Sequence, residues 1–143
     1  MPVLSTRAPN RPADLRLTLT ADHAHGSRLR ALLCSWCAGN GVGGDESGDA
    51  LLVSSELFSN AVAAADVGSS VFISASLRSD AMVLSVSNSG QPFELASVSL
   101  SSIDRLGGRG LMIVQAVGVV SVSHYGGMTT VSAALPIRAQ PMR

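Results

Sequence analysis

The strongest constraint on the fold is alternating hydrophobicity in two pairs of segments, each pair joined by a short turn. The pairs occupy residues 71–77 with 82–86, and 119–124 with 129–135. Alternation of apolar and polar residues predicts half-buried strands, and a short intervening turn predicts a hairpin. Leu15 to Leu19 alternates in the same way. The chain is therefore expected to build one sheet, largely from antiparallel neighbours.

Two segments with helical periodicity lie between the first strand and the first hairpin. Asp22 is expected to cap a helix from about His23 to Ala38, which a glycine cluster then ends. A second helix is expected to start at Asp45 or Ser47 and to run to about Ala65, because its apolar residues lie three and four apart.

A single domain accounts for most of the chain. Residues 1–13 are rich in proline and predict a flexible arm, residues 14–137 the folded domain, and residues 138–143 a flexible tail. The serine-rich loop at 88–107 is long enough to suggest a functional lid, and a third helix is expected at 111–117. This order predicts an α/β (α+β) sandwich of two layers, with a mixed, mostly antiparallel sheet and about three helices on one face.

The charged residues exclude several function classes. All ten basic residues are arginine, and the formal net charge is zero. Without lysine, the chain cannot form a lysine-containing P-loop, a Schiff base, or the strand-lysine site of eukaryotic-type protein kinases. A neutral chain is also not expected to bind nucleic acid directly. No apolar run reaches the roughly 20 residues needed to cross a bilayer, and no signal peptide is recognisable, so we expect a cytoplasmic protein.

The two cysteines, Cys34 and Cys37, form a CxxC sequence within the first predicted helix. The favoured interpretation is that both fill the core face of that helix. The alternative is a thiol redox or metal protein, although no second CxxC or suitably spaced histidine accompanies the pair.

Three short motifs can carry chemistry. Glu56 and Asn60 lie four apart on the second helix and so share a face, where an amide oxygen suits Mg²⁺ and a carboxylate suits proton transfer. Asn88 and Gly90 end a strand, where backbone can approach a flat ligand. The cluster before Leu111 supplies a glycine-rich helix start with exposed N–H groups, which attracts phosphate. Each motif alone also occurs on ordinary helix faces and turns.

Taken in this order, the motifs resemble those of the GHKL (histidine kinase-like) ATPase family. The resemblance runs from about residue 15 to 137 and is strongest to the bacterial anti-sigma-factor serine kinases of the SpoIIAB and RsbW type. It rests on Glu56-Leu-Phe-Ser-Asn60-Ala-Val and on Gly108-Arg-Gly110-Leu-Met-Ile-Val. It implies a Bergerat-type fold, bound ATP and Mg²⁺, and, as partners, a sigma factor and a STAS-type anti-anti-sigma factor. A homodimer formed through the sheet is also compatible with it.

The resemblance further implies a role for each matching residue. Asn60 would hold the Mg²⁺ that bridges the phosphates, and Glu56 would act as general base toward a partner serine. The phosphates would lie against Gly108, Arg109, Gly110 and Leu111, and the adenine against Asn88 and Gly90. Partners would bind over residues 91–107 and the first-helix face bearing Arg28 and Arg30.

Two departures from the family pattern open an alternative. The family carries an aspartate where this chain has Asn88, and a glycine where it has Pro92. A neutral amide accepts hydrogen bonds less strongly than a carboxylate, and proline removes an N–H and backbone freedom. Ala63 to Ala65 also replace a more polar segment. The alternative is a regulator of the same fold that binds proteins but has lost its nucleotide site.

Overall fold

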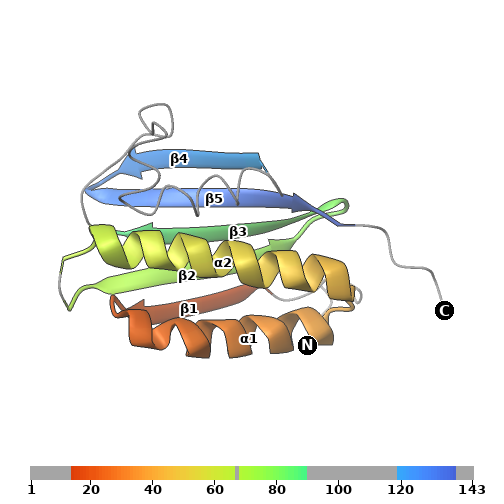
Figure 1. Cartoon of the computed structure of the whole chain (residues 1–143). Helices are drawn as coiled ribbons and strands as arrows, with labels where there is room; N and C mark the ends of the chain where they lie inside the picture. The colour runs from red at the N-terminus through yellow and green to blue at the C-terminus, as the bar shows by residue number, and fades with distance from the viewer. Residues whose placement is uncertain (1–13, 67, 90–118, 138–143) are drawn as a thin grey trace, which may run out of the picture.

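The described part of the chain folds into two layers, a five-stranded sheet and a pair of helices that cover one of its faces (Figure 1). This computed structural model describes residues 14–66, 68–89 and 119–137. The described elements, in chain order, are β1 (Leu15–Thr20), the 3₁₀ turn η2 (His23–His25), α1 (Gly26–Gly39), α2 (Gly44–Ala64), β2 (Ser70–Leu77), β3 (Ala81–Asn88), β4 (Val119–Tyr125) and β5 (Met128–Pro136). The two-layer sandwich predicted from the sequence is thereby confirmed.

The strand order is β1-β2-β3-β5-β4, and every described neighbour is antiparallel. The expected mixed sheet is therefore fully antiparallel within the described residues. Both predicted hairpins form. The second turns through Gly126 and Gly127, whose positive φ angles of 59° and 80° suit the tight two-residue turn that matches strand twist. The third expected helix, at residues 111–117, lies outside the described residues.

The first predicted helix forms with a different start. Asp22 accepts a hydrogen bond from the backbone N–H of Ala24, at 2.9 Å, as predicted for a cap. The first turn it caps is the 3₁₀ turn η2, however, and α1 itself begins at Gly26. At its other end, Gly41 adopts a φ of 73°, and the N–H of Val42 donates to the carbonyl of Cys37 at 3.0 Å. This is a Schellman ending, and it turns the chain back toward α2.

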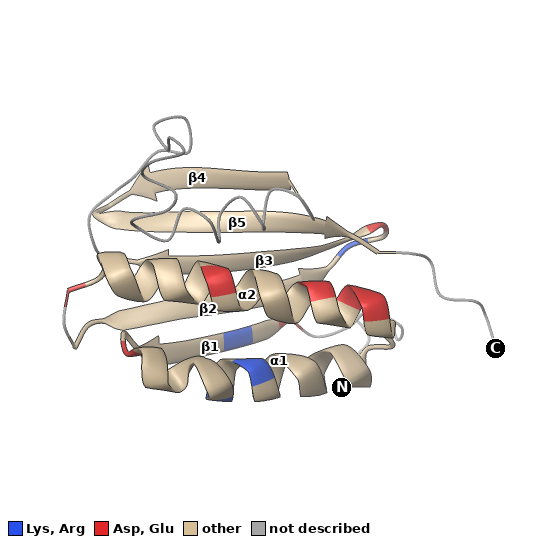
Figure 2. Cartoon of the chain, in the orientation of Figure 1, with Lys and Arg blue, Asp and Glu red and all other residues tan. Residues whose placement is uncertain are grey.

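The helix α2 packs on the centre of the sheet through a stripe of residues three and four apart. Ala50, Val53, Leu57 and Ala61 are buried, as their spacing predicted, while Ala64 is only half-buried. Acidic side chains gather in the first turns of α2 (Figure 2), where the helix dipole favours negative charge. The remaining core comes from alternate residues of the strands, such as Met82, Leu84 and Val86 of β3.

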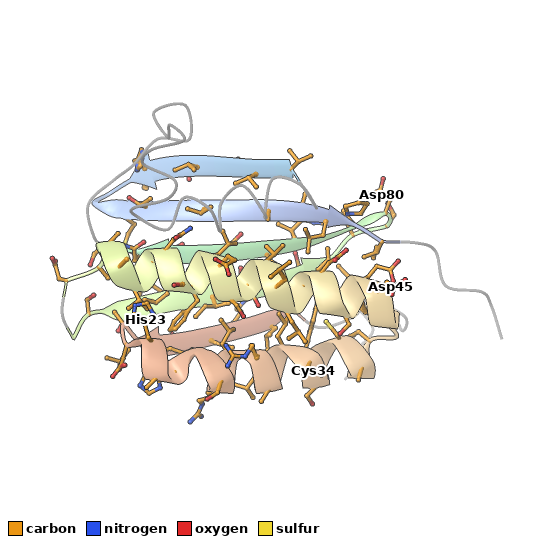
Figure 3. All side chains as sticks on the ribbon, viewed as in Figure 1. His23, Cys34, Asp45 and Asp80 are labelled. Atoms are coloured by element: carbon orange, nitrogen blue, oxygen red, sulfur yellow. The ribbon has the colours of Figure 1, made fainter. Side chains whose placement is uncertain are left out.

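The prediction that both cysteines fill the core is wrong for one of them. Cys37 is buried, whereas Cys34 is exposed (Figure 3). The buried stripe of α1 runs through Leu29, Leu33 and Cys37, each four residues apart. Cys34 follows Leu33 by one residue and is turned by about 100° out of that stripe. Both cysteines are free thiols.

The face of the sheet away from the helices is lined by hydroxyl groups. Ser85 and Ser132 pair across β3 and β5 with their Oγ atoms 2.7 Å apart, and Ser87 pairs with Thr130 at 2.8 Å. A groove of about 500 Å³ lies over this face, with Arg16 and Phe72 among its lining residues. Phe72 is 45% exposed there. The second face of the sheet is therefore largely polar, with Phe72 as the exposed apolar side chain that lines the groove.

Candidate functional site at one end of the sheet

Residues from four elements meet at one end of the molecule. The strand β2 begins shortly after α2 ends, and Phe72 near its start pairs with Ser87 near the end of β3. The opposite end is marked by Asp45, at the start of α2, and by Asp80, in the β2–β3 turn (Figure 3). The last turns of α2, which carry Asn60, therefore lie at the same end as Asn88.

A polar row crosses three strands at this end, on the face that the helices cover. Asn88 of β3 pairs in register with Thr129 of β5, and Thr129 pairs with His124 of β4. The side chain of Thr129 is 1% exposed, and its Oγ1 lies 3.1 Å from Nδ1 of His124. His124 itself is exposed and so opens this row to solvent.

Asn88 is the least satisfied polar side chain of the row. It is 3% exposed, and its Nδ2 has no hydrogen-bond partner among the described residues. A buried donor without a partner costs about 1–3 kcal/mol. The fold therefore buries a hydrogen-bonding group, at a cost in stability, at the position where the family resemblance implies contact with the base. This orphaned group fits a ligand that presents a polar edge.

Glu56 and Asn60 are both half-buried, and one continuous helix, α2, carries them both. Both lie outside the apolar stripe, on a flank different from that of Leu51 and Val62, which pack against the core. The predicted common face is thereby confirmed. Carboxylate and amide oxygens are hard ligands, so the pair suits a magnesium–phosphate group. The described residues contain no cluster of three or more His, Cys, Asp or Glu side chains that could hold a metal by themselves.

The structure leaves part of the predicted site untested. Gly90, Gly108, Arg109, Gly110 and Leu111 lie outside the described residues, as do the predicted lid and Pro92. Arg28 and Arg30 are both exposed on α1. They are two residues apart, however, and therefore lie on opposite flanks of the buried Leu29 rather than on one face. Each arginine belongs to a different flank of the helix, and the predicted single basic face does not form.

Thr129 and His124 belong to this end of the sheet, although neither lies in one of the three sequence motifs. Thr129 occupies a position that alternation assigns to the core, in line with Val131 and Ala133. A polar residue at a predicted core position is the signal that could have drawn attention to it. The large groove described above lies on the other face of the sheet, so it does not include Asn88 or Thr129.

Comparison with known proteins fits this arrangement. The sequence model of the histidine kinase-like ATPase domain matches residues 19–134, which include Glu56, Asn60 and Asn88. The chain belongs to the histidine kinase-like ATPase family. No curated protein matches its sequence significantly. Within the described residues, no helix is long and apolar enough to cross a membrane.

A solved structure shares the fold. The crystal structure of the RsbU and RsbW domains of Rv1364c from Mycobacterium tuberculosis matches with a TM-score of 0.63 and 24% identity. The match covers 93% of this chain but 34% of that one. The chain thus spans about a third of the length of this neighbour. The expected two-layer ATPase fold is confirmed by both comparisons.

Proposed function

We propose that this chain binds ATP with Mg²⁺ and acts as an anti-sigma factor with serine protein kinase activity. It would sequester a sigma factor and phosphorylate a STAS-type anti-anti-sigma antagonist. Family membership supports nucleotide binding, and the neighbour with an RsbW domain supports the regulatory class. The observation that carries the proposal is the convergence of Asn60 and Asn88 at one end of the sheet, with the Nδ2 of Asn88 buried and unpartnered.

In this proposal Asn60 supplies its amide oxygen to Mg²⁺. When bound, the ion would neutralise part of the charge on the phosphates. Gly108, Arg109, Gly110 and Leu111 would lie against those phosphates, and Gly90 beside the base. Arginine and backbone N–H groups take the role that lysine has in other kinases, because the chain contains no lysine.

Glu56 would act as the general base. Its carboxylate accepts the proton from the hydroxyl of a partner serine, and the serine oxygen forms a bond to the γ-phosphorus of ATP. The bond from that phosphorus to the β–γ bridging oxygen breaks, and ADP leaves with the electron pair. Glu56 is half-buried on an outer flank of α2, so a partner chain can approach it.

Calorimetry with a non-hydrolysable ATP analogue and Mg²⁺ tests the binding step. The unmodified chain is expected to bind in the micromolar range, and Asn60→Ala is expected to weaken binding at least ten-fold, because the metal loses its oxygen ligand. Ser59→Ala, one residue earlier on the same helix, is the matched control and should bind like the unmodified chain. Absence of any binding by the unmodified chain, at millimolar analogue, would refute the proposal.

Phosphate transfer tests the kinase step. STAS-domain proteins from the same genome are incubated with the chain and radiolabelled ATP, and labelled serine is sought by mass spectrometry. Glu56→Gln should keep ATP binding and lower the transfer rate at least 100-fold, as expected for a general base. Asp49→Asn makes the same change of charge two turns earlier on α2 and should leave the rate unchanged. Equal rates for Glu56→Gln and the unmodified chain contradict the role given to Glu56.

Asn88 favours a second candidate, a protein-binding regulator of the same fold whose nucleotide site is no longer used. A neutral amide stands where the family carries a carboxylate. Asn88→Asp separates the two functions. It should keep or tighten ATP binding in a working site, and should have little effect in a degraded one. Both candidate functions are compatible with a homodimer that forms through the hydroxyl-lined face of the sheet. Light scattering would measure the mass of the particle in solution and so show whether the dimer forms.

A further inference from the structure

Asn88 differs from a carboxylate in the hydrogen bonds it can offer to a base. An ionised carboxylate only accepts hydrogen bonds, whereas an amide has one accepting oxygen and a donating NH₂ group. An amide therefore pairs side by side with any partner edge that carries one donor and one acceptor, as asparagine does with adenine in DNA. The side chain at position 88 can thus complement two different polar edges, which an aspartate cannot.

The two common kinds of purine present such edges in opposite order. Adenine offers an amino donor at position 6 and an acceptor at N1. Hypoxanthine and guanine offer an oxo acceptor at position 6 and a donor at N1. An amide matches the first edge in one orientation and the second after a half-turn about its last side-chain bond, because the turn exchanges its oxygen and nitrogen.

The structure leaves this half-turn open. Nδ2 of Asn88 has no hydrogen-bond partner among the described residues, so turning the amide breaks no described bond of that donor. The neighbouring hydroxyl of Thr129 is engaged with His124, at 3.1 Å. The backbone of Asn88 is held by its pairing with β5, so the side chain stays at the same place in either orientation. The observation concerns Nδ2 alone: the donor is not held in its present direction by a described hydrogen bond.

We infer that the site accepts both 6-amino and 6-oxo purine nucleotides, with Asn88 as the residue that removes the discrimination between them. This inference rests on the proposed function, since it requires a nucleotide whose base edge meets Asn88. A site built around a fixed donor or acceptor rejects an analogue with the wrong group, often by several orders of magnitude. In the inferred site, the Asn88 amide adopts whichever of its two orientations pairs with the base of the bound nucleotide.

The test compares ATP with ITP, which differ only in the 6-substituent and the N1 proton. Dissociation constants of both, with Mg²⁺, are measured by calorimetry and by the shift in melting temperature. The unmodified chain is expected to bind them with constants within about three-fold of each other. Asn88→Leu, which keeps four side-chain heavy atoms branched at Cγ and removes both hydrogen-bonding groups, should weaken ATP and ITP binding alike, by about ten-fold. Asn88→Ala repeats the test with a smaller side chain.

Ser87→Ala is the matched control, because Ser87 precedes Asn88 and points to the other face of the sheet, where it pairs with Thr130. It should leave both constants unchanged. ATP binding with ITP more than 30-fold weaker overturns the inference and leaves the proposed function standing. Loss of ATP binding alone in the Asn88 variants also overturns it, as does no loss for either nucleotide. Failure of the unmodified chain to bind either nucleotide refutes the proposed function itself.

Discussion

The two ends of the helix-covered face of the sheet differ in what they bury. Toward one end the rows across β3 and β5 are apolar, with Leu84 opposite Ala133 and Val86 opposite Val131. At the other end the next row along both strands is Asn88 opposite Thr129, equally buried but polar. The inward-facing pair Val86 and Val131 is thus apolar, whereas the next inward-facing pair, two residues further along β3, is polar.

Burial alone does not explain this change. An apolar pair at the last row would gain transfer energy and avoid an unpartnered donor. A polar row retained at a core position is what a binding site requires, because its groups must be dry and preorganised for a ligand. The apolar rows therefore hold the fold together, whereas the polar row lowers stability, as expected of a row that serves the proposed nucleotide site.

Among the substitutions considered, Leu84→Ala, in the apolar rows, should lower the free energy of unfolding most. Leu84 is 1% exposed at the centre of the sheet, and its truncation leaves a cavity under α2. The free energy of unfolding should fall by about 2–5 kcal/mol, as measured by urea denaturation followed by circular dichroism. A decrease of less than about 1 kcal/mol in the free energy of unfolding would mean that this row is not part of the core of the domain.

Asn88→Leu should act in the opposite direction at the polar end. The substitution keeps four side-chain heavy atoms branched at Cγ and removes an amide whose Nδ2 has no described partner. The free energy of unfolding should rise by about 1 kcal/mol, while nucleotide affinity falls. Denaturation of the ligand-free protein measures the first change. If Asn88→Leu instead lowers stability as much as Leu84→Ala does, the contrast between the two ends is wrong.

Thr129→Val should have a smaller effect on stability, because it removes a bond that solvent can replace. Oγ1 of Thr129 lies 3.1 Å from Nδ1 of His124, and His124 is exposed. The free energy of unfolding should change by less than about 1 kcal/mol, and the affinity for the ATP analogue should fall about five-fold. Thr130→Val, on the other face of the sheet, is the control and should leave affinity unchanged.

The fold could be predicted from the sequence because the spacing of apolar residues and the residues that form turns are both visible in short segments. Alternation placed all five strands, and the glycine pair at Gly126 and Gly127 placed the last hairpin. The sequence was a poorer guide where a residue had to be assigned to the buried or the exposed face of a helix. Cys34 and Cys37 lie three apart and were expected to share the core, yet the stripe through Leu33 leaves Cys34 outside it.

The candidate site was predictable only in part, for a similar reason. The four-residue spacing of Glu56 and Asn60 was enough to place them on one flank of α2. The contact of Asn88 with Thr129 depends on β3 pairing with β5, and that pairing joins strands from separate hairpins. No local pattern fixes which strand β3 takes as its second neighbour, so the polar row becomes visible only in the folded sheet.

The smallest expected effect comes from Cys37, a buried titratable group of α1 toward the apolar end. Burial raises the pKa of the Cys37 thiol above its ordinary value of 9.0, a hydrogen bond with Ser47 lowers it, and the charge of Cys34 raises it again. A raised pKa in the folded state means that the neutral thiol stabilises the fold. This contribution is complete below about pH 9 and is lost as the pH rises through the folded-state pKa.

The expected loss is below about 1 kcal/mol, and it is isolated by comparing the pH dependence of unfolding between the unmodified chain and Cys37→Ala. The alanine variant should be less stable throughout, because it leaves a small cavity, but its stability should fall less steeply above pH 9. Cys34→Ser removes an exposed thiol and should keep most of the decline. Parallel curves for the unmodified chain and Cys37→Ala would show that the thiol is not held in an apolar environment, and would place solvent at the end of the molecule where the apolar rows predict none.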